Sequence, residues 1–344
     1  MRVIFDKLAQ LPLQINKYWL SPLEQAVSSD MIRHTTVVNL SGGGYTGVGE
    51  DVTYSGKDQL TFQDNGETLN IIGDYTLASF SDKIGQLKLF SQEPEQEAYY
   101  NYRRWAFESS ALSLALQQSG TTLDKAIGRS LSPLNFVVST RLDGHESVKP
   151  IKKLLSDHPT LRFKLDPTLK WSDELINELA TLDVVDVLDL KGHYHGTVVD
   201  MPPNPELYRK IVETFPKAWI EDAMVSSETE SILRPHADRL TWDAPIHSVN
   251  DIKSMPFSPP KMVNIKPSRF GSIKNLLETY EFCESNNIGM YGGGQFELGP
   301  GRRQIQYLAA LFHPDTPNDT APASYNKLPR PKDLPVSPLS VEQF

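Results

Sequence analysis

Short apolar runs and longer amphipathic stretches take turns along the second part of the chain. Runs rich in β-branched and aromatic residues are typical of buried strands, and apolar residues three or four positions apart are typical of helices. Their alternation predicts a parallel sheet covered by helices, and a short additional strand near Leu311 would bring the number close to that of a closed barrel. The predicted strands are 135–142, 161–166, 184–190, 218–221, 240–243, 262–266 and 288–291, and the predicted helices between them are 146–156, 172–182, 205–215, 228–237, 249–255 and 272–286.

The N-terminal part has a different pattern. Residues 33–54 alternate β-branched residues around a glycine-rich turn, which is typical of an antiparallel hairpin. Residues 95–118 carry an apolar stripe at helical spacing, at Phe107, Ala111, Leu114 and Ala115. We therefore predict an N-terminal α+β domain at 1–130 and an α/β domain at 131–312, a (β/α)-type barrel of the modified TIM kind. The Pro- and Asn-rich stretch 313–344 is expected to pack on the surface or back on the first domain.

Composition and charge narrow the class of protein. The 344 residues carry a formal net charge of −9 without a dense basic run, which argues against a nucleic-acid partner. The single cysteine, Cys283, cannot form an intramolecular disulfide. No stretch of about 18 apolar residues is present, so we predict no membrane partner and a cytoplasmic location.

Acidic residues stand at the ends of three successive predicted strands, and a lysine ends the next. These residues are Asp189, Glu221, Asp243 and Lys266, and each interval is long enough for one β/α unit. The carboxyl ends of neighbouring barrel strands meet at one opening. Hard oxygen ligands gathered there suit Mg²⁺, and an ammonium beside them suits proton transfer to or from a carbon acid.

Six segments in order make the chain similar to the enolase superfamily, in the branch of mandelate racemase and muconate-lactonizing enzyme. The hairpin resembles the family's capping domain, and the helix before the barrel resembles its Ala-rich helix. The sixth-strand segment with Lys266, rather than a seventh-strand histidine, favours the lysine-bearing, muconate-lactonizing-like subgroup. The segments are GYTGVGE (44–50), RRWAFESSALSLAL (103–116), AWIEDA (218–223), TWDAPIHS (241–248), NIKPSRFGSI (264–273) and GGGQFELGPG (292–301).

The resemblance implies Mg²⁺, with Mn²⁺ as a second candidate, held by Asp189, Glu221 and Asp243. It implies an isomerase or lyase that removes a proton alpha to a carboxylate through an enediolate. The outcome would be cycloisomerisation, racemisation or epimerisation, or syn-dehydration as in o-succinylbenzoate synthase. The contrasting hypothesis is a catalytically degenerate barrel that acts as a binding or structural protein.

Two strand ends depart from the family pattern. The second strand normally ends Lys-x-Lys, but here it has Lys164-Leu-Asp166, and the third has Asp189-Leu-Lys191 where Asn usually follows the aspartate. Either Lys191 or Asp166 is then the candidate group on the face opposite Lys266. Lys164 either neutralises charge at the site or forms a salt bridge with Asp166 or Asp189. In an alternative register, the segment with Asp166 is the third strand, and Asp166 and Asp189 are the first two metal ligands.

Four further residues are candidates for contact with a small carboxylate substrate. Glu297 lies in the glycine-rich loop 292–301, and His193 lies in a loop after the third strand, two residues before His195. Trp19 and Leu20 belong to residues 18–31, which the resemblance makes a specificity loop over the barrel opening. Their apolar character favours a hydrophobic substrate over an acid sugar. The family often forms homo-oligomers, but the sequence shows no self-complementary face.

Overall fold

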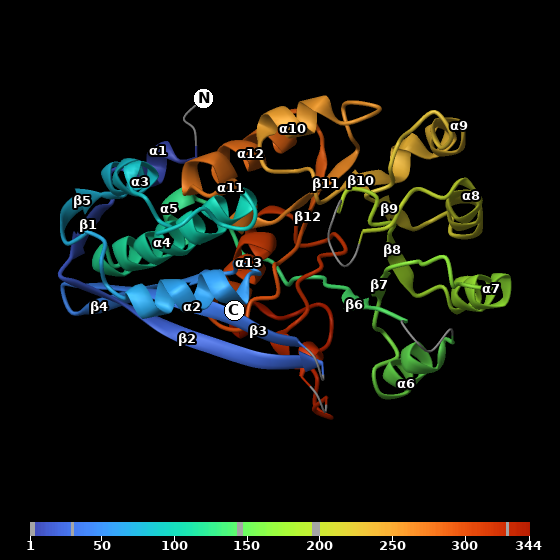
Figure 1. The fold of residues 1–344 in the computed structure, drawn as a ribbon, viewed down its shortest axis with the longest axis horizontal. Helices are drawn as coiled ribbons and strands as arrows, with labels where there is room; N and C mark the ends of the chain where they lie inside the picture. The colour runs from blue at the N-terminus through green and yellow to red at the C-terminus, as the bar shows by residue number, and fades with distance from the viewer. Residues whose placement is uncertain (1–3, 29–30, 143–146, 195–199, 328–329) are drawn as a thin grey trace.

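A curled parallel sheet forms the second part of the molecule. The computed structural model describes residues 4–28, 31–142, 147–194, 200–327 and 330–344. The seven strands lie side by side in chain order, and the helices that follow them cover the outer face (Figure 1). This is the predicted barrel-type fold. The strands are β6 (Val138–Thr140), β7 (Phe163–Leu165), β8 (Val185–Asp189), β9 (Trp219–Glu221), β10 (Leu240–Trp242), β11 (Met262–Ile265) and β12 (Gly289–Gly292).

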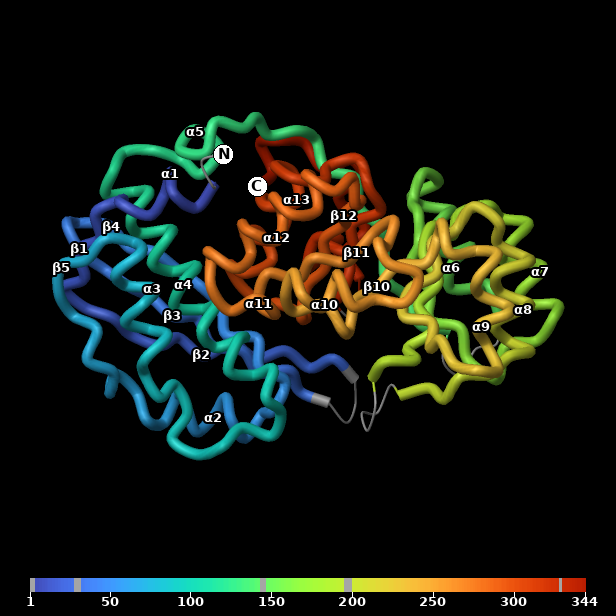
Figure 2. Tube along the Cα trace, turned by 90° about the horizontal axis from the view of Figure 1, so that it is seen from above, coloured from blue at the N-terminus to red at the C-terminus, as the bar shows by residue number. Residues whose placement is uncertain are grey.

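Six of the eight helices described in this part overlap the predicted amphipathic stretches, and α11 and α13 were not predicted. Their apolar residues face the strands, and the side of the sheet that the helices cover is therefore as apolar as expected for a parallel sheet. Helices α6 to α9 lie away from the N-terminal domain, whereas α10 to α13 lie next to it (Figure 2). The helices are α6 (Lys149–Asp157), α7 (Asp173–Leu182), α8 (Pro205–Thr214), α9 (Glu230–Leu233), α10 (Val249–Ser254), α11 (Pro267–Phe270), α12 (Ile273–Ser285) and α13 (Pro300–Phe312).

Residues 318–319 join the first and last strands of the sheet. The Val137 amide donates to the Asn318 carbonyl at 2.9 Å, and the Asp319 amide donates to the Gly292 carbonyl at 2.8 Å. The Asn318 side chain adds a bond from the Gly292 amide at 2.6 Å. The prediction of an eighth strand near Leu311 is wrong, because the apolar residues there have helical spacing and form α13. Part of the C-terminal stretch, which was expected on the surface or on the first domain, thus lies in the barrel wall.

The N-terminal domain combines two antiparallel sheets with a long helix. Its glycines explain the motif GYTGVGE: a Cβ on Gly47 would lie 2.2 Å from the Ser110 carbonyl oxygen, and one on Gly49 2.0 Å from that of Ala106. Only glycine lets β4 pack this closely on α4. The elements are α1 (Asp6–Ala9), β1 (Pro12–Ile15), β2 (Lys17–Ser28), β3 (Met31–Gly42), β4 (Tyr45–Asp51), α2 (Gly56–Asn65), β5 (Gly73–Thr76), α3 (Leu77–Gln86), α4 (Ala98–Gln118) and α5 (Leu123–Ile127).

Residues 17–28 form strand β2, so the predicted loop at 18–31 is strand over 18–28, and its role in specificity stays a prediction. The strand pairs with β3 from Lys17, opposite Ser41, to Ala26, opposite Ile32. Pro22 is compatible with the strand because β2 is an edge strand, where a missing amide donor is tolerated. Residues 29–30 of the predicted loop lie outside the described residues. Within the described chain, none of the helices combines the length and the apolar character that crossing a membrane requires.

We expect His313 to make the barrel closure sensitive to acid. Asn318 Oδ1 already accepts from Gly292, so His313 Nδ1, 2.7 Å away, must be the donor. Burial lowers the pKa of His313 to about 4, although the Asn318 bond opposes the shift. The unfolded chain, with a pKa near 6.5, then binds more protons between about pH 4 and 6.5, so stability falls as the pH falls through this window, by about 3 kcal/mol at pH 4.

This dependence can be measured by urea unfolding of wild type and His313→Gln between pH 4 and 7.5. The variant should lose less stability on acidification than wild type, whereas His158→Gln, which changes a half-exposed histidine, should follow wild type. Parallel curves for wild type and His313→Gln would contradict the expectation.

Candidate active site

Three carboxylates from neighbouring strands converge at the carboxyl end of the sheet. Asp189 and Glu221 are register partners on β8 and β9, and Asp243 directly follows β10. All three are fully buried, and one oxygen of each lies within 4.8 Å of the others. The parallel sheet causes this convergence, since equivalent positions of adjacent strands point to the same side at the same level.

Buried lysines compensate these carboxylates. Lys164 Nζ on β7 lies 2.5 Å from Glu221 Oε1 and 3.2 Å from Asp189 Oδ2. It also lies 3.5 Å from Asp319 Oδ2. Lys266, which follows β11, places its Nζ 2.7 Å from Asp243 Oδ2. Without such partners, charges at this depth would cost several kcal/mol each.

Two further groups bind Asp243, and sequence reasoning missed both. Arg269 Nη1 donates to Asp243 Oδ1 at 2.7 Å and also to the Asp243 carbonyl. The Tyr194 hydroxyl donates to Asp243 Oδ2 at 2.7 Å. Arg269 stands three residues after Lys266 on the short helix α11, so its place in NIKPSRFGSI was an available signal. Tyr194 lies in a loop, where no periodicity indicates which way the side chain points.

The two departures from the family pattern lie side by side. β7 is the second strand of the sheet, which excludes the alternative register in which it is the third. Lys191 Nζ binds Asp189 Oδ2 and lies 3.7 Å from Asp166 Oδ1. Arg141 Nε donates to Asp166 Oδ2 at 2.8 Å. The lysine on the third strand thus faces both its own aspartate and the aspartate of the second strand.

The pKa values of the three carboxylates differ in direction, and they show that Glu221 has less compensating positive charge than Asp189 and Asp243. Burial alone would raise the pKa of Asp189, but Lys191 and Lys164 hold it at about 2. Arg269 and Lys266 likewise hold the pKa of Asp243 well below its usual value against the effect of burial. Burial raises the pKa of Glu221 well above its usual value, because Lys164 is outweighed and Asp189 and Asp243 add repulsion.

A divalent cation would supply the positive charge that Glu221 lacks. Among the described residues, the buried Glu221 Oε2 has no hydrogen-bond partner. The donor set of Asp189, Glu221 and Asp243 consists of hard carboxylate oxygens, as Mg²⁺ and Mn²⁺ prefer. One feature argues against a bound cation: lysine or arginine side chains already bind both aspartates.

The contacts described for two other candidate residues, Glu297 and His193, are with groups outside the carboxylate cluster. Glu297 holds its own loop, with Oε2 3.1 Å from Arg302 Nη2 and Oε1 accepting from the Gln295 amide at 2.6 Å. The His193 ring packs edge-on against Trp242 at 5.7 Å between centroids, and His195 lies outside the described residues.

Trp19 and Leu20 lie within β2, opposite Asn39 and Val38 of β3. Farther along β2, Gln25 Nε2 donates to the carbonyl of Asn326 in the C-terminal stretch at 3.2 Å. Neither Trp19 nor Leu20 has a described hydrogen bond or ion pair with the carboxylate cluster.

Two buried charges of the N-terminal domain fix the loop after β12. Arg33 Nη2 donates to the carbonyls of Val52 at 2.6 Å and Gln295 at 2.9 Å. Glu50 accepts the amides of Leu298 at 2.7 Å and Gly301 at 2.9 Å. The N-terminal domain thereby holds residues 295–301 at both ends. This loop begins beside the site, since a Cβ on Gly293 would lie 2.7 Å from Lys266 Cε.

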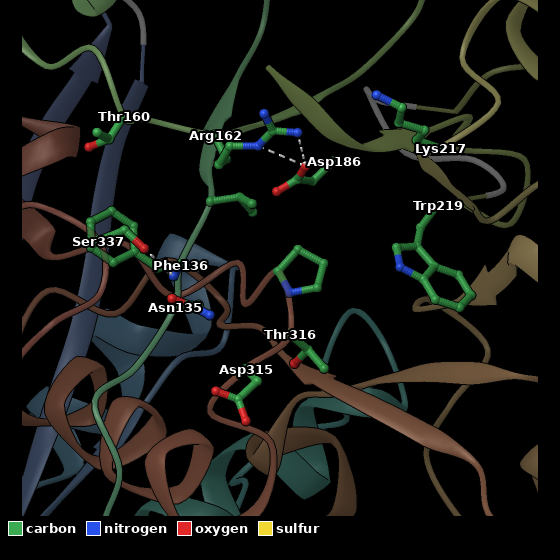
Figure 3. A pocket seen from close by; sticks show the side chains of 12 residues that line it. Asn135, Phe136, Thr160, Arg162, Asp186, Lys217, Trp219, Asp315, Thr316 and Ser337 are labelled. Carbon is green, nitrogen blue, oxygen red and sulfur yellow. Dashed lines mark hydrogen bonds and ion pairs between the residues drawn. The ribbon is translucent and has the colours of Figure 1, made fainter. Parts of the chain in front are cut away.

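A cavity of about 400 Å³ lies at the opposite, amino end of the strands. Figure 3 shows Trp219 on one side and the Arg162–Asp186 ion pair across the top. Arg162 precedes β7, and Trp219 is the first residue of β9. Barrels of this type carry their chemistry at the carboxyl ends of the strands, so the carboxylate cluster, and not this cavity, is the candidate active site.

Comparison with known proteins agrees with this fold. Over 333 residues, covering 88% of this chain and 82% of the relative, the sequence is 22% identical to o-succinylbenzoate synthase of Bacillus subtilis. A member of the enolase superfamily from Listeria innocua superposes with a TM-score of 0.63 at 17% identity, covering 90% of this chain and 86% of that one. A dipeptide epimerase from Methylococcus capsulatus complexed with Mg ion superposes with a TM-score of 0.69 at 14% identity, covering 89% and 90%.

The molecule therefore has the enolase-superfamily fold that the sequence motifs predicted, a capping domain on a β/α barrel. Residues 6–126 match the N-terminal domain, and residues 130–327 the C-terminal domain, of a domain of unknown function, DUF8230. The chain belongs to the DUF8230 family.

We expect Glu50 to be needed for order in the loop after β12. Replacing Glu50 by Ala removes the acceptor of the Leu298, Gly299 and Gly301 amides and of the Thr35 hydroxyl. Unpaired buried amides cost about 1–3 kcal/mol each, so the variant should lose about 3 kcal/mol of stability or more. Hydrogen exchange followed by mass spectrometry should show faster exchange at 298–301.

The matched control is Glu24→Ala, which removes a carboxylate with an exposed side chain on β2. It should leave both stability and loop exchange unchanged. Unchanged exchange at 298–301 in Glu50→Ala would show that Glu50 does not hold the loop.

Proposed function

We propose that this chain is a Mg²⁺-dependent enzyme that removes a proton alpha to the carboxylate of a small molecule. The observation that carries the proposal is the convergence of Asp189, Glu221 and Asp243 to within 4.8 Å, with Lys266 2.7 Å from Asp243. The relative named o-succinylbenzoate synthase and the structural neighbour named dipeptide epimerase support it. Both names are compatible with a lyase or isomerase.

When bound, a divalent cation would stabilise the negative charge that develops on the substrate carboxylate as the proton leaves. Asp189, Glu221 and Asp243 would hold this cation. The protein supplies the proton acceptor: Lys266 stands next to Asp243, on the strand beyond β10. The Lys266 side chain is only 8% exposed, so water competes little for the proton.

The opposite side of the site belongs to β7 and β8. In the strand order β11–β10–β9–β8, Lys266 and Lys191 flank the pair of strands that carries Glu221 and Asp243. Proton return on the other face needs two lysines on opposite sides of one substrate carbon, one as a neutral amine that takes the proton and the other as an ammonium that supplies one. We therefore propose Lys191, assisted by Asp166, for the second face, and Lys164 as a fixed counter-charge for Asp189 and Glu221.

One observation favours the second candidate, a barrel without catalysis. Both oxygens of Asp189 and both of Asp243 already accept hydrogen bonds within the protein. A barrel neutralised by its own lysines and arginine needs no metal to be stable. A metal-free protein that exchanges no alpha proton, with any of a broad panel of carboxylates, would establish this candidate.

We expect Lys266→Ala to slow the exchange of the alpha proton strongly. A positioned general base contributes about 10² to 10⁴ in rate, so the loss should fall in this range. The measurement is deuterium incorporation from D₂O, followed by NMR, into dipeptides, N-acylamino acids and cyclic carboxylates with added Mg²⁺.

Lys261→Ala is the matched control, because Lys261 is an exposed lysine just before the same strand. It should exchange at the wild-type rate. EDTA should stop exchange in both wild type and control, and Mg²⁺ should restore it. Full exchange by Lys266→Ala would exclude Lys266 as the base.

A further inference from the structure

Lys191 is held at the end of β8 by its own backbone. Its amide donates to Asp189 Oδ1 at 3.1 Å, and its φ of 54° is in the left-handed region, which residues other than glycine seldom adopt. The next residue, Gly192, donates its amide to the Asp222 carbonyl at 2.9 Å. A Cβ on Gly192 would lie 2.8 Å from the Met224 amide nitrogen, so only glycine fits there. The chain therefore turns Lys191 back towards the site.

A second carboxylate is within reach of the same ammonium group. Lys191 Nζ binds Asp189 Oδ2, and Asp166 Oδ1 lies 3.7 Å away. Asp166 is 8% exposed, and Arg141 binds its other oxygen. Within the described part of the chain, Asp166 Oδ1 accepts no hydrogen bond. A shift of about 1 Å would bring Lys191 to hydrogen-bond distance from it.

The other lysines of the cluster have no comparable alternative. Lys164 is bound to Glu221 and Asp189 and faces Asp319, so three carboxylates hold it in the middle. Lys266 is described with one carboxylate partner, Asp243. Lys191 differs from both: one carboxylate, Asp189, binds its ammonium group, and the second, Asp166, has a buried oxygen without a described hydrogen bond 3.7 Å away.

We propose that Lys191 is a resident counter-ion of Asp189 that moves to Asp166 when a divalent cation takes Asp189. This inference rests on the proposed function, since it assigns Asp189 to the metal. At contact distance a divalent cation and an ammonium repel each other strongly in a buried site. The flexible four-carbon stem of lysine allows the move without a change in the backbone, and the ammonium keeps its proton throughout.

The inference explains why the two departures occur together. Aspartate at position 166 supplies the second acceptor, and lysine at position 191 supplies the cation that uses it. With the metal in place, Lys191 would lie beside Asp166 on the face opposite Lys266. Asp166 is then a positioning residue: it acts through Lys191 and touches neither substrate nor metal.

The test is a titration of the full-length protein with Mg²⁺ alone by isothermal calorimetry. We expect Lys191→Gln to bind Mg²⁺ about tenfold more tightly than wild type, because no ammonium competes for Asp189. Asp166→Asn should bind it about tenfold more weakly, because Lys191 loses its second acceptor. In the double variant the Asp166→Asn effect should vanish. Lys170→Gln, an exposed lysine in the loop after β7, is the matched control and should equal wild type.

Equal Mg²⁺ affinities for wild type and Lys191→Gln would overturn the inference, as would an Asp166→Asn effect of equal size in both backgrounds. A purely structural salt bridge would lower the melting temperature of the variants without this coupling. Crystal structures of wild type with and without Mg²⁺ give an independent measurement if a variant does not fold. The Lys191 Nζ–Asp166 Oδ1 distance should shorten to hydrogen-bond range, and no shortening would contradict the inference.

The outcomes separate this inference from the proposed function. Mg²⁺ binding and proton exchange by wild type, with no effect of Lys191→Gln, would leave the function standing and remove the inference. Mg²⁺ binding by Lys191→Gln but not by wild type would overturn the move of Lys191 to Asp166 and argue against a metal-dependent wild-type enzyme. Mg²⁺ binding by neither protein would overturn the inference.

Discussion

Charge compensation inside the barrel is the constraint on which the rest of the structure depends. Parallel strands bring Asp189, Glu221 and Asp243 to one buried point, and burying uncompensated carboxylates costs more than a domain's net stability allows. Lys164 answers this by lying between carboxylates of β8, β9 and the closing segment 318–319. The same short segment therefore closes the sheet and places Asp319 in the charge network.

At the boundary between the domains, backbone carbonyls and amides compensate two buried charges. Arg33 and Glu50 are both about 1% exposed, yet Arg33 makes its described hydrogen bonds to carbonyl oxygens, and Glu50 accepts mainly amides of the loop after β12. Burial and the nearby Glu297 raise the pKa of Glu50, and the hydrogen bonds from Thr35, Leu298 and Gly301 offset this only in part. Because the loop begins beside Lys266, the capping domain is part of the support of the site rather than a separate cover.

The sequence predicted what depends on local periodicity and on strand ends. Each of the seven strands, and the acids at their ends, could be found because apolar runs and turn residues recur at β/α spacing. β2 was missed because the family resemblance assigned residues 18–31 to a loop, although an edge strand accepts Pro22. Asp319 and Tyr194 were missed as members of the site because their partners lie far away in the chain and no period links them. Arg269 was missed although it stands three residues after Lys266 in the segment NIKPSRFGSI. The relation between Asp166 and Lys191 was visible as a pair of substitutions, but their facing geometry required the structure.

The register between β7 and β8 and the backbone at Lys191 explain how this lysine reaches the carboxylates. Lys164 of β7 pairs in register with Val187 of β8, so Asp166 lies level with Asp189, and the backbone of Lys191 lies beyond both. Each strand residue advances about 3.3 Å, so an extended Lys191 would leave the level of the carboxylates. The left-handed backbone at Lys191 and the close passage at Gly192 turn the side chain back to that level. Through this turn, a lysine two residues beyond the third strand reaches the carboxylates at the level of Asp189. Asp166 on the second strand and Asp189 on the third then both lie close enough to compensate its charge.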